Sequence, residues 1–135
     1  MQMSIDFHLD VGLEDAIEKV SAALKAEGFG VLTRIDVHKT FKEKLGEDFR
    51  EYVILGVCSP KLAWQAFNHD PRVGLMLPCN VTVEAAEAGG MDVKLVHPEM
   101  LLGMGGFAED PIFCELRDHA TPVFERVARS LGAAG

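Results

Sequence analysis

Apolar residues recur at helical spacing near both ends of the chain, and this pattern constrains the fold more than any other feature. Residues 13–27 form the first amphipathic helix, and Gly28 is a natural stop for it. A second helix begins at Asp110-Pro111; Pro122 must kink or restart it, with Thr121 as the new cap. The two apolar stripes are Leu13, Ala16, Ile17, Val20, Ala23 and Leu24, then Val123, Phe124, Val127 and Leu131. Each helix therefore has one face to bury.

Other segments have the patterns of β-strands. In residues 30–37 every second side chain, from Val31 to Val37, lies on one face, which predicts a half-buried strand. Residues 52–58 are continuously apolar and rich in β-branched side chains, which predicts a central strand covered on both faces. Ala88-Gly89-Gly90 is typical of a hairpin. The expected strands are residues 3–9, 30–37, 52–58, 79–86 and 91–97.

Short helical inserts are expected between the strands. Residues 38–46 have mixed charges around two apolar positions and end at Gly46. Ser59-Pro60 has the residue types of a helix start, and Pro71 ends that helix. The order of elements predicts an α+β fold of the form β-α-β(4)-α. Its mostly antiparallel sheet has two main helices on one side, and residues 1–135 make a single domain.

Charge and composition exclude several classes of partner. The formal net charge of −8, with Lys and Arg scattered, disfavours binding to nucleic acid and to anionic membranes. No segment approaches the roughly 18 apolar residues that a membrane span needs. The N-terminal residues lack the basic segment and apolar run of a secretory signal, and the odd number of cysteines, 3, makes no disulfide framework. We therefore expect a cytoplasmic protein.

Four segments resemble domain-of-unknown-function family 302. They are Gly28-Phe29-Gly30-Val31-Leu32, Ile35-Asp36-Val37, Ile54-Leu55-Gly56-Val57-Cys58-Ser59-Pro60 with Leu62-Ala63, and Leu75-Met76-Leu77-Pro78-Cys79-Asn80-Val81. The similarity runs from about residue 13 to residue 98 and departs at residues 103–106 and in the C-terminal tail. It implies a TATA-box-binding-protein-like fold, which is a curved antiparallel sheet carrying two helices, and a homodimer. Both cysteines of the motif segments recur in the family, which has no established reaction.

Cys58 is the leading candidate for a functional residue. It ends an apolar strand and precedes the expected helix start at Ser59-Pro60, where free N–H groups favour a thiolate. The alternative is a small buried residue at a tight corner, since free cysteine packs as a hydrophobe. If the thiolate interpretation holds, Cys58 is the most reactive of the three thiols. Cys114, on the C-terminal helix, is expected to belong to the core.

Three other residues complete the candidate ligand-binding site. Cys79 begins a strand, and strand ends joined by a helix can lie side by side, so Cys58 and Cys79 can share a ligand or a disulfide. Asp36 is expected near Cys58 on a neighbouring strand, with a surface ion pair as the alternative. Asn80 is expected to donate hydrogen bonds to the ligand, with a backbone-satisfying role as the alternative.

Metal and cofactor sites have weaker support. The sequence has no C-x-x-C or H-E-x-x-H motif, and we expect no metal; a soft site of the two cysteines with His38, His69 or His97 is a minor alternative. No Walker or dinucleotide motif identifies a cofactor. Residues 100–107, rich in Met and Gly, form a lid, a dimer contact or a loop folded under the last helix.

The residues leave three functions open, and with them the question of whether the chain is an enzyme. The favoured one is a small-ligand-binding homodimeric module with its site near Cys58 and Cys79, because no general base adjoins Cys58 in the sequence. The second is a thiol-dependent enzyme or redox protein, in which Cys58 attacks and Cys79 resolves. The third is a structural or regulatory dimer with no ligand.

Overall fold

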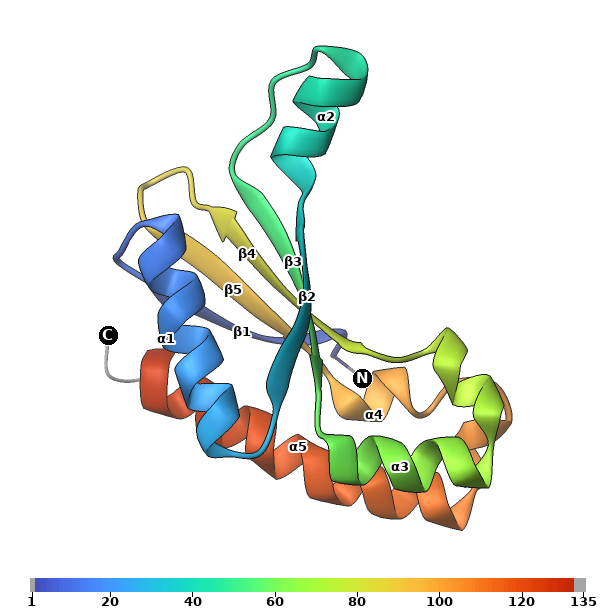
Figure 1. The fold of residues 1–135 in the computed structure, drawn as a ribbon. Helices are drawn as coiled ribbons and strands as arrows, with labels where there is room; N and C mark the ends of the chain where they lie inside the picture. Colours follow the sequence, from blue (N-terminus) through green and yellow to red (C-terminus); the bar gives the residue numbers. More distant parts are fainter. Residues whose placement is uncertain (1, 133–135) are drawn as a thin grey trace.

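Five strands form one antiparallel sheet, and two long helices pack on one of its faces (Figure 1). The computed structural model describes residues 2–132. The strands are β1 (Ser4–Leu9), β2 (Gly30–Asp36), β3 (Tyr52–Cys58), β4 (Cys79–Ala85) and β5 (Met91–Val96), in the sheet order β1-β5-β4-β3-β2. The α+β class, the order of strands and helices and the antiparallel pairing expected from the sequence are confirmed.

The helices differ in length and position. They are α1 (Leu13–Ala26), α2 (Val37–Leu45), α3 (Pro60–His69), α4 (Pro98–Leu101) and α5 (Pro111–Gly132), with 3-10 turns η1 (Pro71–Leu75) and η2 (Gly105–Glu109). Helices α1 and α5 are the two main helices, α2 and α3 are the expected short inserts, and α4 was not predicted. Among residues 2–132, no helix combines the length and the apolar character that crossing a membrane requires.

The main core lies between the sheet and helices α1 and α5. Alternate side chains of the three inner strands point to this layer, as the two-residue period of a strand requires. Each fully buried Val, Leu or Phe contributes about 1.5–3 kcal/mol relative to an exposed position. The fully buried large side chains of this layer are Val20, Leu24, Val53, Leu55, Val57, Val81, Val83, Val93, Leu95 and Phe124.

The hairpin between β4 and β5 depends on glycine, as expected. Gly89 and Gly90 both have positive φ angles, 104° and 72°. A Cβ at Gly90 would also lie 2.5 Å from the backbone oxygen of Leu9. The turn therefore needs glycine both for its backbone conformation and for the close approach of β1.

Strand β2 is not half-buried, so that prediction is wrong. It is an edge strand, and the residues from Gly30 to Ile35 are all exposed. A register irregularity between Val31 and Thr33 also interrupts the alternation of its faces. Residues 52–58 were predicted to be the central strand, but β4 takes the central position and β3 lies beside it. Helices cover β3 on the face of Val53, Leu55 and Val57. Periodicity shows which side chains share a face, but not whether another layer covers that face.

Helix α5 continues through Pro122, so the expected restart at Thr121 is wrong. The Thr121 hydroxyl does not cap a new helix and has no hydrogen-bond partner in the structure. Proline costs the helix one backbone hydrogen bond. Val123 and Phe124 are buried against the sheet directly after it, and their burial stabilises the last turns of α5.

Candidate functional site

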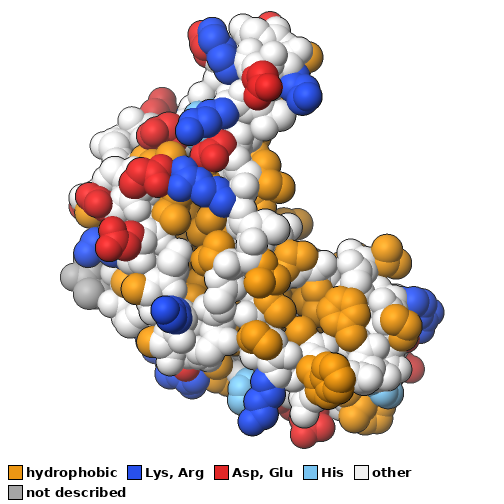
Figure 2. Space-filling view, viewed as in Figure 1, with side chains coloured by type: hydrophobic (Ala, Val, Ile, Leu, Met, Phe, Trp, Pro, Cys, Tyr) orange, Lys and Arg blue, Asp and Glu red, His pale blue; other side chains and the backbone are white. Residues whose placement is uncertain are grey.

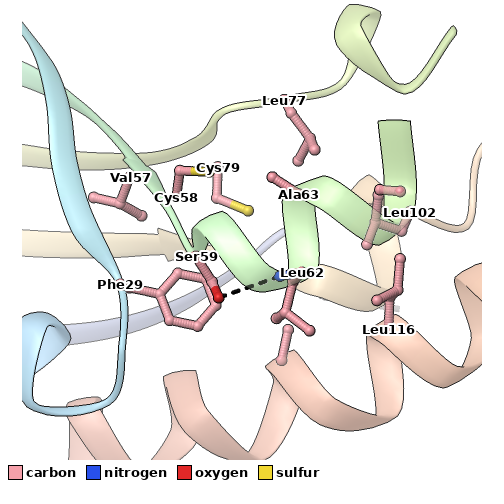
Figure 3. A pocket seen from close by; sticks show the side chains of 12 residues that line it. Phe29, Val57, Cys58, Ser59, Leu62, Ala63, Leu77, Cys79, Leu102 and Leu116 are labelled. Carbon is pink, nitrogen blue, oxygen red and sulfur yellow. Dashed lines mark hydrogen bonds between the residues drawn. The ribbon is translucent and has the colours of Figure 1, made fainter. Parts of the chain in front are cut away.

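Cys58 and Cys79 line the same cavity (Figure 3). It lies where β3 and β4 meet α3, with α5 along one wall, and its volume is about 40 Å³. The lining residues are Phe29, Val57, Cys58, Ser59, Leu62, Ala63, Ala66, Leu77, Cys79, Leu102, Leu116 and Ala120. Apart from the two thiols and the Ser59 hydroxyl, the lining side chains are hydrocarbon.

Strand register brings the two cysteines together. Cys79 pairs with Val57, the residue before Cys58, so the two thiols come from neighbouring positions on adjacent strands. The next residue pair along the two strands joins Gly56 to Asn80, and space is tight there. A Cβ at Gly56 would lie 2.9 Å from Cγ of Pro78. The absence of a side chain at Gly56 thus lets the segment that leads into Cys79 pack against β3.

The helix start that follows Cys58 forms as the sequence predicted. The Ser59 hydroxyl accepts a hydrogen bond from the Leu62 backbone N–H at 3.5 Å, and Pro60 occupies the first turn of α3. This cap directs the chain from the strand end into the cavity wall. Because the Ser59 hydroxyl is already used in the cap, it adds little polarity to the site.

Burial favours the neutral form of both thiols. Removal from water raises the pKa of Cys58 above its ordinary value. Burial, and secondarily the neighbouring Cys58, raise the pKa of Cys79 to about 12. Both groups are therefore neutral thiols near pH 7. Burial thus opposes the thiolate that the sequence suggested for Cys58 beside the free N–H groups of α3.

Asp36 is not near Cys58, so the expectation that it helps to orient a ligand there is wrong. It pairs with Val53 at the opposite end of β3, five residues from Cys58, or roughly 16 Å along the strand. Its carboxylate accepts hydrogen bonds from Arg34, whose guanidinium also binds Glu14 on α1 at 2.8 and 2.7 Å. This is the surface ion pair that stood as the alternative.

Asn80 adjoins Cys79 in sequence but not in the site. Successive side chains of a strand point to opposite faces, so Asn80 lies on the face away from the cavity, and it is exposed. It does not line the cavity. Its expected contact with a ligand bound beside Cys79 is therefore wrong.

The three histidines proposed as minor metal ligands lie elsewhere. His38 shares hydrogen bonds with the backbone of Tyr52, His69 binds Asp110, and His97 accepts from the Glu99 backbone N–H. None of them lines the cavity. Within residues 2–132, no group of three His, Cys, Asp or Glu side chains is arranged to hold a metal ion.

The Met- and Gly-rich segment is folded under the last helix. Arg117 of α5 donates to the carbonyl oxygens of Leu102, Phe107 (3.1 Å) and Ala108 (2.9 Å), and Phe107 is buried against Phe113. Leu102 forms part of the cavity wall. Sequence analysis missed Arg117, because an arginine in a helix carries no signal that it will bind a distant loop.

The cavity walls contributed by Leu77, Leu102, Leu116 and Ala120 were also not predicted. They come from two loops and from α5, and isolated apolar residues in such segments are indistinguishable from ordinary core. Cys114, expected in the core, is half-buried, and its sulfur lies 2.8 Å from an Arg117 nitrogen.

The family model described as "Domain of unknown function DUF302" matches residues 5–133. The chain belongs to the DUF302 family. This DUF302 match extends beyond residue 98, where the resemblance noted in the sequence ended, and includes helix α5. A crystal structure of an uncharacterized conserved DUF302 protein from Bacillus stearothermophilus is similar to it, with 33% identity, 97% of each chain covered and a TM-score of 0.79.

No protein with a curated functional description matches the chain. Membership of the DUF302 family therefore establishes the fold without assigning a reaction. The TATA-box-binding-protein-like fold and the homodimer that the resemblance implied remain predictions.

Proposed function

We propose that this DUF302 protein is a cytoplasmic small-ligand-binding module that works as a homodimer, with its site in the cavity beside Cys58 and Cys79. The observation that carries the proposal is a cavity with an almost entirely hydrocarbon lining and two neutral thiols. Apolar concave sites with a few polar groups are the usual form of small-molecule sites.

The size and lining of the cavity define the class of ligand. A volume of about 40 Å³ compares with roughly 10–15 Å³ for one water-sized sphere on the same measure. Sites for drug-sized molecules are on the order of 300–1,000 Å³. The cavity thus suits a short uncharged apolar group, such as the end of an alkyl chain. A charged group would lose its hydration without gaining a partner.

Binding without turnover is favoured over thiol catalysis. A nucleophilic cysteine needs a thiolate, and burial raises the pKa of both thiols in this cavity. Among the residues that line it, there is no histidine, carboxylate or lysine to act as a base.

One observation supports a redox function as a second candidate: the two thiols share one cavity. In this reaction Cys58 and Cys79 lose two protons and two electrons and form one S–S bond, while glutathione disulfide is reduced to two glutathione thiols. Equilibration with glutathione buffers, followed by mass mapping, tests it. A 58–79 disulfide at cytosolic potentials supports the redox function, and two free thiols at those potentials exclude it.

Short n-alkanols, from butanol to octanol, are suitable probes for the binding function, because each carries a small apolar end. We expect methyl NMR shifts of Val57, Leu62 and Leu77 that saturate with alkanol concentration. Ala63→Leu should fill the cavity and abolish saturation. Ala22→Leu, at an exposed position of α1, is the matched control and should bind as the wild type does. Saturable shifts that persist in Ala63→Leu would contradict the assignment of the site.

A further inference from the structure

Large hydrophobic side chains are exposed around the concave side of the molecule (Figure 2). In this view charged side chains gather mainly on the opposite side and on the projecting segment around α2, while hydrophobic ones cover the hollow and the region of α3. The exposed large hydrophobic side chains of the elements that border this hollow are together called the apolar face: Val31, Leu32 and Ile35 on β2, Phe41 and Leu45 on α2 with Phe49 after it, and Trp64, Phe67 and Leu75 on α3 and η1.

The area of the apolar face matches that of a protein interface. Trp64, Leu45 and Leu75 are 73%, 69% and 86% exposed. With about 100 Å² for each of its partly exposed side chains, the face presents on the order of 900 Å². The largest apolar patch on a typical monomer is roughly 300–600 Å², and a standard interface buries about 800 Å² per partner. The apolar face is therefore large enough for a stable dimer.

Helix α2 is the part of this face that most needs a partner. It has nine residues and none of them is buried, whereas isolated helices shorter than about 12–15 residues are marginal in water. Its base is fixed: Phe41 packs edge-on against Phe49 at 5.4 Å, and Arg50 binds Glu84 at 2.9 and 2.7 Å. The helix thus projects from the sheet as an arm (Figure 1), and its Phe41 and Leu45 side chains are exposed.

We propose that a second copy of this chain covers the apolar face, with the α2 arm of each copy lying against α3 and η1 of the other. This rests on the homodimer of the proposed function and adds its interface. The arm and the α3 region border the hollow at opposite ends (Figure 2). A two-fold axis places the α2 arm of each copy against the α3 region of its partner. The same symmetric contact therefore covers the arm and the α3 region of both copies.

Charge favours the same face over the others. Each copy has a net charge of −8, so two copies repel each other where their carboxylates meet. The centre of an interface is usually depleted in charged residues. The apolar face has that composition, and it is continuous with the exposed edge strand β2, which a partner would also protect from random strand pairing.

The single tryptophan of the chain, Trp64, reports directly on this interface. We expect sedimentation of a dimer at micromolar concentration, with a blue-shifted Trp64 emission protected from iodide quenching. Dilution to the monomer should shift the emission to the red and restore quenching. A dimer with freely quenched Trp64, or a chain that stays monomeric at high micromolar concentration, overturns the proposal.

Opposite charges test the contact between arm and helix. Leu45→Lys and Trp64→Glu should each give a folded monomer, because both side chains are exposed and leave the core intact. Mixing the two variants should give a heterodimer. In one of its two arm contacts the introduced lysine meets the introduced glutamate, and in the other contact both side chains are the wild-type ones. Met3→Lys, at an exposed hydrophobic position on the strand-β1 side, is the control and should remain dimeric. Absence of the mixed dimer overturns the arm exchange.

Failure of this interface and failure of the ligand site give different results. The cavity is formed within one chain, so the monomeric variants should still show saturable alkanol shifts. A monomeric wild type that binds alkanol contradicts the interface alone. A dimer with protected Trp64 that does not bind alkanol contradicts the ligand site alone. Recruitment of a different protein to the face in place of a second copy would also leave the wild type monomeric by itself.

Discussion

The guanidinium of Arg117 donates a hydrogen bond to the sulfur of Cys114 at 2.8 Å, and both residues lie on α5 outside the apolar cavity. The arrangement separates the three cysteines into two environments. Cys114 is half-buried next to the guanidinium of Arg117, whereas Cys58 and Cys79 line a cavity whose other side chains are almost all apolar.

We therefore expect Cys114 to be alkylated first, before Cys58, with Cys79 labelled only on unfolding. Burial raises the pKa of Cys58, and raises that of Cys79 to about 12, so few thiolates form at those two positions. Iodoacetamide labelling from pH 6 to 9 with peptide mass mapping measures the order. Labelling of Cys58 first at pH 7 would restore the hypothesis that it is the reactive thiol.

The stability of the protein should depend on pH through His8. Hydrogen bonds to Asp92 (2.8 Å) and Asp10 (2.9 Å) raise the pKa of His8 above its ordinary value of 6.5. Folding favours the protonated form of His8, so protonated His8 stabilises the folded protein. This stabilisation is complete below pH 6.5 and is lost as the pH rises through the raised pKa of His8 in the folded state. Urea unfolding of His8→Gln should lose this part of the pH dependence. His119→Gln, at an exposed position on α5, should keep it.

Phe124→Ala should destabilise the protein by about 3–5 kcal/mol. Phe124 is fully buried between α5 and the sheet, and its ring contacts that of Phe29 edge-on, with centroids 5.1 Å apart. Met3→Ala removes an exposed side chain and should change the free energy of unfolding by less than about 0.5 kcal/mol. Equal urea midpoints for the two variants would refute this description of the core.

We expect no salt-sensitive binding to duplex DNA. The net charge of −8 repels phosphate, and several of the arginines are already paired with carboxylates, among them Arg34, Arg50, Arg72 and Arg126. Gel shifts at 50 and 200 mM salt measure this. A tight complex at the lower salt that dissociates at the higher would contradict the prediction.

The helices and strands were largely predictable because each depends on neighbours in the sequence. The stripe from Leu13 to Leu24 and the cap at Ser59 are local patterns, and both formed as expected. The error at β2 came from a question that local pattern does not answer. Ile35 has the spacing of a buried residue, but β2 lies at the edge of the sheet.

The site was predictable in part. Cys58 and Cys79 meet because the strands that end and begin with them are paired, which follows from an antiparallel sheet. The position of Asp36 was predicted wrongly because a residue on a neighbouring strand can lie anywhere along that strand. Its position is set by the pairing with Val53, which the sequence did not indicate. Leu102 and Leu116 reach the cavity through tertiary packing, which no local pattern of theirs indicates.

Leu102 is held in place by Arg117 of α5, so this wall of the cavity also depends on the final helix. The cavity can therefore be completed only late in synthesis. The first thiol of the cavity is translated well before its last wall, because Leu116 and Ala120 belong to the final helix. A single domain folds as a unit, so the cavity is complete only after the final helix has left the ribosome. A nascent chain that already contains both cysteines therefore lacks the α5 wall of the pocket, and Cys79 becomes buried only when that helix is in place.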